Sequence, residues 1–156
     1  MLFDTHSHLN FPQFEADLPL VLQRAKEAGV SEVLVVGTDM AGNQKALQVA
    51  RDYQVWAAVS FHPHEAESKE VDLEKIKEFI RDQRVVAVGE TGLDYACPAD
   101  KEKQALLFRS LLKTAEESAL PVIVHSRDAA EETLMLVYKD AKNWAIALNA
   151  GGVALS

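Results

Sequence analysis

Short apolar, β-branched runs alternate along this chain with longer segments in which apolar residues recur every three to four positions. Runs of the first kind are typical of buried strands, and spacing of the second kind is typical of amphipathic helices. The predicted strands are 1–4, 33–37, 55–60, 85–89, 122–125 and, with a weaker signal, 144–148. The predicted helices are 15–29, 41–53, 73–82, 101–119 and 128–142. This order predicts one α/β domain over residues 1–156, because no linker or change of composition divides them.

The predicted strands lack the apolar–polar alternation of a half-exposed sheet, so we expect parallel strands buried on both faces between helices. Two folds have this order of elements, the doubly wound open sheet and the (β/α)₈ barrel, or TIM barrel. Polar groups follow several of the predicted strands. A barrel gathers its chemistry at many strand ends, whereas an open sheet uses chiefly one switch point. We therefore predict a TIM-barrel type architecture, of which this chain holds about the first five to six βα units.

The composition is that of a soluble globular protein, with 48% hydrophobic and 26% charged residues. The sequence has neither an apolar run of about 20 residues nor the basic and then apolar start of a secretion signal. We therefore expect a cytoplasmic protein that does not enter a membrane. The single cysteine, Cys97, cannot form an internal disulfide, which agrees with a reducing compartment. A net charge of −8 argues against a broad basic surface for nucleic acid, and no glycine-rich phosphate loop follows the first strand.

All five histidines fall at or just beyond the end of a predicted strand, which suggests one polar centre. His6 and His8 follow the first strand. In an extended segment residues two apart point to the same side, so both imidazoles can bind one metal ion. His125 ends the fifth strand; a lone histidine there is commonly a core residue, but its alignment with the other strand ends favours a ligand. We expect His6, His8 and His125 to bind metal.

Two carboxylates follow the fourth predicted strand. Glu90 comes directly after it, and its two oxygens can each bind a different cation. We expect Glu90 to be a catalytic, metal-bridging residue; the simpler alternative is a carboxylate that is paired with an arginine or solvated. Asp94 either holds a ligand histidine in its orientation or is an ordinary loop carboxylate.

Three further side chains are candidates for contacts with a substrate. His62 and His64 flank Pro63, which stiffens the turn, and imidazoles can bind phosphate or transfer a proton. Either histidine could instead support a metal ligand or lie at the surface. Arg127 can hold phosphate oxygens through two N–H groups, although an arginine at a helix start also pairs with carboxylates such as Asp128. We expect His62, His64 and Arg127 to bind substrate.

Four segments of the chain resemble the TatD family of metal-dependent deoxyribonucleases. They are DTHSH at 4–8, FHPH at 61–64, GETGLDY at 89–95 and PVIVHSRDA at 121–129. They occur in the order and at the spacing of the family, over residues 4–129. A match of this extent is far more specific than two neighbouring histidines alone.

The resemblance implies an amidohydrolase-type (β/α)₈ barrel with two divalent cations that hydrolyses phosphodiester bonds, usually in DNA and often from the 3′ end of a single strand. It also implies that His6 and His8 bind one cation, that Glu90 bridges, and that His125 belongs to the second. DNA would be bound through its phosphates, with little sequence specificity, and metal charge would replace a basic surface. The identity of the cation stays undecided, because imidazole favours zinc while carboxylate and phosphate oxygens suit magnesium or manganese.

The last part of the chain departs from the family pattern. Family members have about 260 residues, near the typical length of about 250 for this barrel, with a further histidine on the sixth strand and an aspartate after the eighth. Here no histidine follows His125 and no acidic residue follows Asp140. We expect impaired activity, and either self-association through the sheet edges of an incomplete barrel or a reorganised open sheet.

Two alternative functions follow from the same residues. One is an inactive barrel fragment with a partial metal site that acts only by binding. The other is a metal-dependent amide or ester hydrolase of the same architecture, which a lysine at a strand end would favour; no predicted strand ends in lysine.

Overall fold

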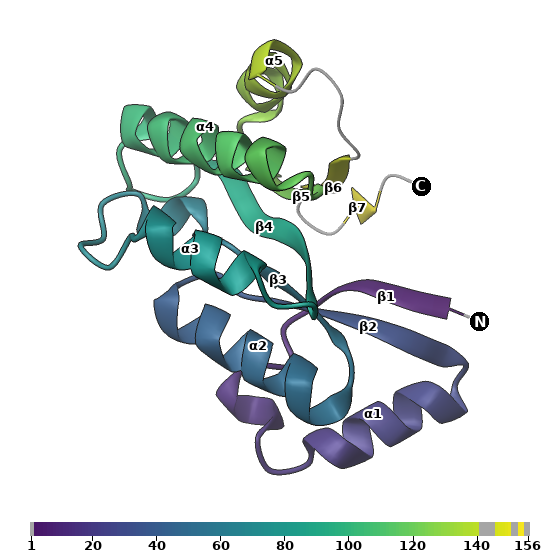
Figure 1. Cartoon of the computed structure of the whole chain (residues 1–156). Helices are drawn as coiled ribbons and strands as arrows, with labels where there is room; N and C mark the ends of the chain where they lie inside the picture. Colours follow the sequence, from purple (N-terminus) through teal and green to yellow (C-terminus); the bar gives the residue numbers. More distant parts are fainter. Residues whose placement is uncertain (1, 141–145, 151–152, 155–156) are drawn as a thin grey trace.

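The computed structural model describes residues 2–140, 146–150 and 153–154 (Figure 1). The strands are β1 (Leu2–Ser7), β2 (Val30–Val36), β3 (Trp56–Val59), β4 (Val85–Asp94), β5 (Val122–Arg127), β6 (Ile146–Ala150) and β7 (Val153–Ala154). The α-helices are α1 (Leu18–Glu27), α2 (Met40–Tyr53), α3 (Leu73–Ile80), α4 (Lys101–Ser118) and α5 (Ala130–Asp140). Short 3₁₀ helices lie at η1 (Pro12–Phe14) and η2 (Pro63–Glu65). None of the helices in these ranges is long and apolar enough to cross a membrane.

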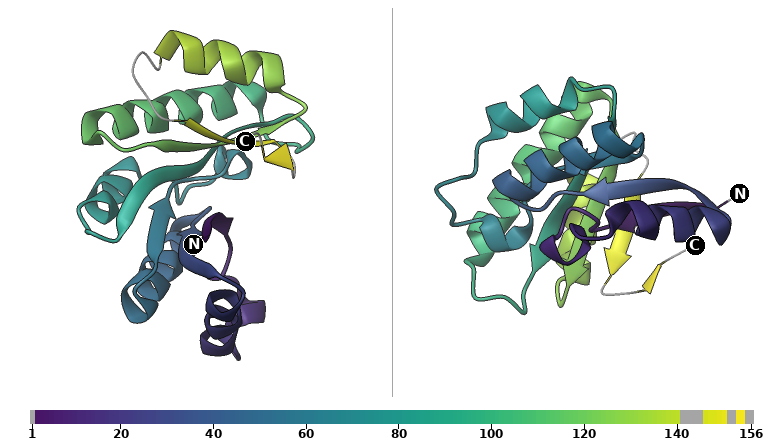
Figure 2. Two further views of the ribbon diagram at one scale, coloured as in Figure 1. Left: turned by 90° about the vertical axis from the view of Figure 1, so that its right-hand side faces the viewer. Right: turned by 90° about the horizontal axis from the view of Figure 1, so that it is seen from below.

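The seven strands form one sheet in the order of the sequence, from β1 to β7. Strands β1 to β6 pair in parallel, and β7 turns back antiparallel to β6. In a barrel each strand lies beside its predecessor, whereas a doubly wound sheet reverses its order at a switch point. Helices α2, α3 and α4 follow one another along one side of the curved sheet (Figure 1), which Figure 2 shows from two further directions. This order confirms the predicted TIM-barrel type architecture, present here as a partial barrel.

Strands β1, β4 and β5 extend further than their apolar runs. The prediction that Glu90 follows its strand is wrong, because β4 continues to Asp94. In the same way His6 lies inside β1 and His125 inside β5. The pairing of β4 with β5 goes on as far as Asp94 opposite Arg127. Strand pairing rests on backbone hydrogen bonds, so it does not stop where the side chains become polar.

The expected burial on both faces is confirmed for β2 to β5. On the outer face β3 to β5 pack against helices α2 to α5 in the main hydrophobic core, which contains among others Val59, Ile76, Phe108, Leu111, Val122 and Val124. Strand β2 packs on that side through Val33 and Val35 against Leu18 of α1 and Ala46 and Val49 of α2. The alternate residues of the same strands form a smaller cluster on the inner face: Leu34, Val36, Ala58, Ala87 and Ile123. His125, two residues after Ile123 of this inner cluster, belongs to the site.

The same expectation is wrong for β1, where Leu2 and Phe3 are 60% and 48% exposed. Within the described residues β1 is an edge strand that pairs with β2 alone, and about half of each of these two side chains faces solvent. The predicted sixth strand, 144–148, is shifted to β6, and residues 144–145 lie outside the described residues. The predicted helix 128–142 is α5, and its last two positions also lie outside.

Candidate metal centre

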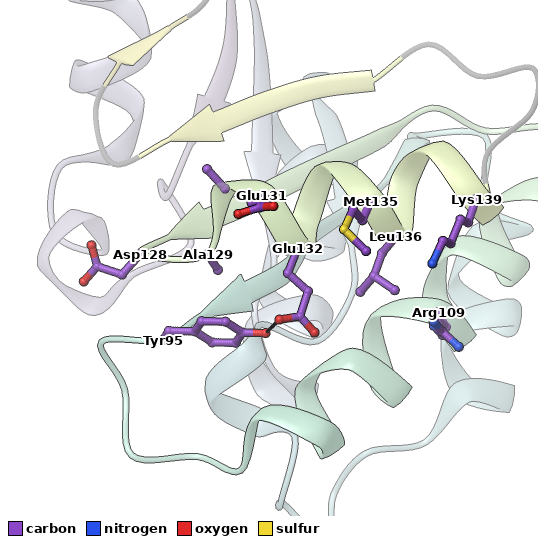
Figure 3. A pocket seen from close by; sticks show the side chains of 10 residues that line it. Tyr95, Arg109, Asp128, Ala129, Glu131, Glu132, Met135, Leu136 and Lys139 are labelled. Atoms are coloured by element: carbon purple, nitrogen blue, oxygen red, sulfur yellow. Dashed lines mark hydrogen bonds between the residues drawn. The ribbon is translucent and has the colours of Figure 1, made fainter.

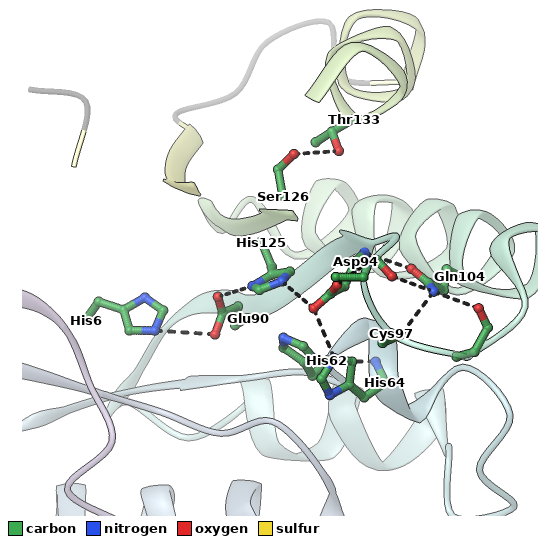
Figure 4. Close-up of polar contacts among 12 residues, drawn as sticks. His6, His62, His64, Glu90, Asp94, Cys97, Gln104, His125, Ser126 and Thr133 are labelled. Atoms are coloured by element: carbon green, nitrogen blue, oxygen red, sulfur yellow. Dashed lines mark hydrogen bonds and ion pairs between the residues drawn. The ribbon is translucent and has the colours of Figure 1, made fainter. Parts of the chain in front are cut away.

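A row of polar contacts on the inner face of the sheet joins His6, Glu90, His125 and Asp94 (Figure 4). The alternation of side chains along a strand explains this position for β5. Ile123 belongs to the inner cluster, so His125, two residues later, points to the same side. Parallel neighbours bring β1, β4 and β5 to the same end of the sheet, and residues far apart in sequence therefore meet there.

His6, His8 and Glu90 form a triangle of ligand atoms. The Nε2 atoms of His6 and His8 are 3.3 Å apart, and they lie 3.4 Å and 3.9 Å from Oε2 of Glu90. Ligands that share one transition-metal ion at bond lengths of about 2.1 Å lie roughly 3.5 Å from one another. The three atoms therefore fit a single divalent cation with small adjustments of the side chains.

His8 has the tautomer that a metal ligand needs. Its Nδ1 atom lies 3.1 Å from the carbonyl oxygen of Val36. A carbonyl can only accept, so Nδ1 carries the hydrogen and Nε2 keeps its lone pair for an ion. Burial and the neighbouring His6 lower the pKa of His8, against the opposing effect of the bond to Val36. The neutral imidazole that binds metal is thereby favoured.

The two carboxylate oxygens of Glu90 face different histidines. Oε1 lies 2.9 Å from Nδ1 of His125, while Oε2 is the oxygen nearest to His6. Burial of Glu90, which is 4% exposed, opposes its ionisation. The hydrogen bonds with His125 and His6 outweigh burial and hold the pKa of Glu90 below its ordinary value. An ionised carboxylate with one oxygen toward each group of histidines has the geometry of a bridging ligand.

His125 is held between two carboxylates. Its Nδ1 faces Glu90, and its Nε2 lies 3.1 Å from Oδ2 of Asp94. Burial lowers the pKa of His125, but the two carboxylates outweigh burial and raise it above its ordinary value. The same Oδ2 of Asp94 lies 3.0 Å from Nε2 of His64. Because both ring nitrogens of His125 are engaged, an ion can bind there only when one of these contacts opens.

His62 packs its ring against the other imidazoles of the site. Its ring centroid lies 4.4 Å from those of His64 and of His125. Burial, followed by the charge of His125, lowers the pKa of His62 to about 4, so the ring is neutral near pH 7. Its Nδ1 accepts a hydrogen bond from the backbone N–H of His64 at 3.3 Å, and the ring hydrogen is therefore on Nε2. The side chain of His64 is 52% exposed.

Arg127, the third residue expected to bind substrate, lies at the end of β5. Its carbonyl oxygen accepts a hydrogen bond from the backbone N–H of Tyr95 at 2.9 Å. The residue is exposed, and no hydrogen bond or ion pair joins its guanidinium to the rest of the described chain. The structure therefore brings the histidines and the two carboxylates together, without a hydrogen bond or ion pair to the guanidinium of Arg127 among the described residues.

Two buried amides that were not predicted from the sequence hold the segments that carry the site. Oε1 of Gln104 accepts from the backbone N–H of Asp94 at 2.8 Å, and Nε2 donates to its carbonyl oxygen at 3.0 Å. Asn43 binds the backbone of Ser60 in the same two-point manner. Both amides lie on the buried side of their helices. A polar residue at an apolar helical position is the sequence signal that would have indicated them.

A hollow of about 510 Å³ lies on the helical side of the molecule, between α4 and α5. Tyr95, Arg109, Glu132 and Met135 are among its lining residues (Figure 3). The hydroxyl of Tyr95 donates a hydrogen bond to the carboxylate of Glu132 beside it. No histidine lines this hollow, so it is separate from the candidate metal centre.

The comparisons with known proteins agree with the geometry. The family model described as TatD-related DNase matches residues 3–148. The uncharacterised metal-dependent hydrolase YabD of Bacillus subtilis is 40% identical over 145 residues, which are 90% of this chain and 56% of that protein. The 3′-5′ ssDNA/RNA exonuclease TatD of Erwinia tasmaniensis is 36% identical over 140 residues, which are 87% of this chain and 54% of that protein. The chain thus spans about half the length of the curated relatives it matches.

The crystal structure of YjjV, a TatD homologue from Escherichia coli, has the same fold over the aligned part. The TM-score is 0.82 at 37% sequence identity, and the alignment covers 89% of this chain and 56% of that one. The shared fold agrees with a partial barrel whose strands follow one another in sequence order. The family match, the curated relatives and the shared fold together show that this chain belongs to the TatD-related DNase family.

Proposed function

We propose that this chain forms part of a two-metal site that hydrolyses phosphodiester bonds of DNA. The observation that supports this most is the orientation of Glu90, with one oxygen toward His6 and His8 and the other toward His125. A carboxylate that bridges two cations needs this arrangement. The relative from Erwinia tasmaniensis is named a 3′-5′ ssDNA/RNA exonuclease, which favours single strands attacked from the 3′ end as the substrate.

In this proposal His6, His8 and Glu90 would hold one divalent cation. Glu90 and His125 would hold the second, and Asp94 orients the ring of His125. The bound cations would activate water and neutralise charge on the phosphate. Magnesium, manganese and zinc are all candidates, because the ligand set combines imidazole nitrogen with carboxylate oxygen.

The remaining side chains act on the substrate. His62 is neutral and carries its hydrogen on Nε2, so it can donate a hydrogen bond to a phosphate oxygen. The half-exposed ring of His64 and the exposed Arg127 are accessible to the nucleic acid from solvent. A net charge of −8 argues against a broad basic surface, and bound cations would supply the positive charge that attracts the DNA backbone.

A second candidate function is metal binding without catalysis. It is favoured by His125, both of whose ring nitrogens are already engaged by carboxylates. We therefore expect cleavage by this chain to be slow.

Cleavage of single-stranded DNA labelled at either end tests the proposal, with Mn²⁺ or Mg²⁺ and with chelator. We expect slow shortening from the 3′ end that is lost with chelator and in Glu90→Gln. Glu70→Gln is the matched control, because Glu70 is exposed. Cleavage that persists in Glu90→Gln or in chelator would overturn the proposal. Metal binding that calorimetry detects, without any cleavage, would establish the second candidate instead.

A further inference from the structure

Three different metal-binding side chains meet beside the candidate metal centre. The ligand atoms of His64, Asp94 and Cys97 all lie within 4.8 Å of one another. The Asp94 side chain is 1% exposed, whereas that of His64 is 52% exposed. The carboxylate thus forms the floor of this group, and an ion can reach it from the side of His64. None of the three belongs to the triangle of His6, His8 and Glu90.

The turn after β4 places the sulfur in this group. Nε2 of Gln104 lies 3.3 Å from Sγ of Cys97 and 3.0 Å from the carbonyl oxygens of Asp94 and Ala99. Oδ1 of Asp94 accepts a hydrogen bond from the backbone N–H of Ala96 at 3.0 Å. These contacts fix the turn at both ends, so the thiol is held beside the carboxylate rather than meeting it by chance.

We propose that His64, Asp94 and Cys97 form a separate site for a thiophilic divalent cation such as Zn²⁺ or Cd²⁺. One sulfur, one nitrogen and one oxygen ligand with an open fourth position make a tetrahedral site of the kind that zinc accepts. The sulfur selects against magnesium and calcium, which prefer oxygen. The cation displaces the thiol proton on binding. The ligand atoms of a tetrahedral site lie roughly 3.5 Å from one another. Here all three atoms lie within 4.8 Å of one another, and Nε2 of His64 and Oδ2 of Asp94 are 3.0 Å apart.

This site is linked to the proposed catalytic one through a single atom. Oδ2 of Asp94 contacts both His64 and His125. A cation bound to His64, Asp94 and Cys97 through this oxygen competes with Nε2 of His125 for it. The proposal does not depend on nuclease activity, because the ligands are assigned from their own geometry.

Titration of the reduced chain with Cd²⁺ tests the site, followed through the ultraviolet charge-transfer band of a cadmium–thiolate bond. The chain has one cysteine, so the band reports on Cys97 alone. We expect one cadmium-thiolate equivalent per chain, no band in Cys97→Ser, and at least about tenfold weaker binding in His64→Ala. His8→Ala is the matched control in the neighbouring triangle and is expected to keep the band and its affinity.

Two results would overturn the proposal. Equal affinity in His64→Ala would mean that the thiol binds the ion without the cluster, and a band confined to a dimeric fraction would mean that two chains share it. Circular dichroism confirms that the variants are folded, which we expect for His64→Ala because half of the side chain faces solvent. Failure of the DNA cleavage experiment leaves this test unaffected.

Discussion

The side chain of Asn43 makes two hydrogen bonds with the backbone of Ser60. Nδ2 donates to the Ser60 carbonyl oxygen at 2.7 Å, and Oδ1 accepts from the Ser60 N–H at 3.0 Å. Both residues are fully buried. Ser60 follows β3 and precedes His62 by two residues, and the N–H of His62 in turn donates to the carbonyl oxygen of Thr38 at 2.8 Å. A helical amide therefore fixes the segment that brings His62 to the site.

Asn43→Leu is expected to lower the free energy of unfolding by roughly 2–5 kcal/mol, because each buried polar group that loses its partner costs about 1–3 kcal/mol. Urea denaturation measures this change. Gln48→Leu is the matched control, since Gln48 is exposed on the same helix. If both substitutions had the same small effect, the pairing of Asn43 with Ser60 would not stabilise the protein.

The order of the elements was predictable because buried parallel strands leave continuous apolar runs, as at Val122–Val124. The shared direction of His6 and His8 was predictable as well, since it follows from the period of an extended strand. These inferences depend only on neighbours in sequence. They gave the fold class and drew attention to the strand ends.

Other features depend on contacts between distant segments. Strand β4 continues past Glu90 because its backbone pairs with β5. The polar residues and Gly92 in this segment do not indicate a strand. The role of Gln104 depends on which backbone groups its amide meets, and these belong to Asp94 on another element. The exposure of Phe3 depends on which segments pack over that face of β1, and the apolar run alone does not indicate this. No periodic pattern in the sequence indicates these features.

Gly92 is expected to tolerate no side chain. Its φ of +148° is rare for other residues, and a Cβ would lie 2.0 Å from the carbonyl oxygen of His125 and 3.0 Å from its nitrogen. Both are backbone atoms of the paired strand, so they cannot turn away. Gly92→Ala is expected to cost roughly 3 kcal/mol or more, measured by thermal denaturation. Gly42→Ala is the control, because its nearest atom is a side-chain oxygen of Asp39 at 3.2 Å. Equal stability of the two variants would contradict the close approach of β4 and β5.

Acid is expected to destabilise the metal-free chain through His62. Burial, with the charge of His125, lowers the pKa of His62 from 6.5 to about 4. The unfolded chain therefore binds a proton between these values that the folded chain does not, so stability falls as the pH decreases through this window. The contribution of neutral His62 to the free energy of unfolding is fully present above pH 6.5 and amounts to at most about 3 kcal/mol. The pKa of His125 is raised above 6.5. Its contribution to stability is therefore present below pH 6.5 and is lost as the pH rises through the folded-state pKa.

Urea denaturation of the chelator-treated chain from pH 7 to pH 4.5 measures this effect. His62→Gln is expected to lose a large part of the acid dependence, and His64→Gln, from the same segment, serves as its comparison. An unchanged pH dependence in His62→Gln would show that other groups are responsible.

Self-association through β1 is expected at high concentration. Leu2 and Phe3 are 60% and 48% exposed on this strand, which pairs with β2 alone among the described residues. An edge strand with exposed apolar side chains offers free backbone groups to a second copy, and a lysine at such an edge opposes pairing. Light scattering should therefore show a mass that rises with concentration and that falls toward the monomer in Phe3→Lys. Leu20→Lys, at a 55% exposed position of α1, adds the same charge away from the edge and should leave the association unchanged. A monomer at all concentrations, or equal loss in both variants, would show that β1 is not the contact.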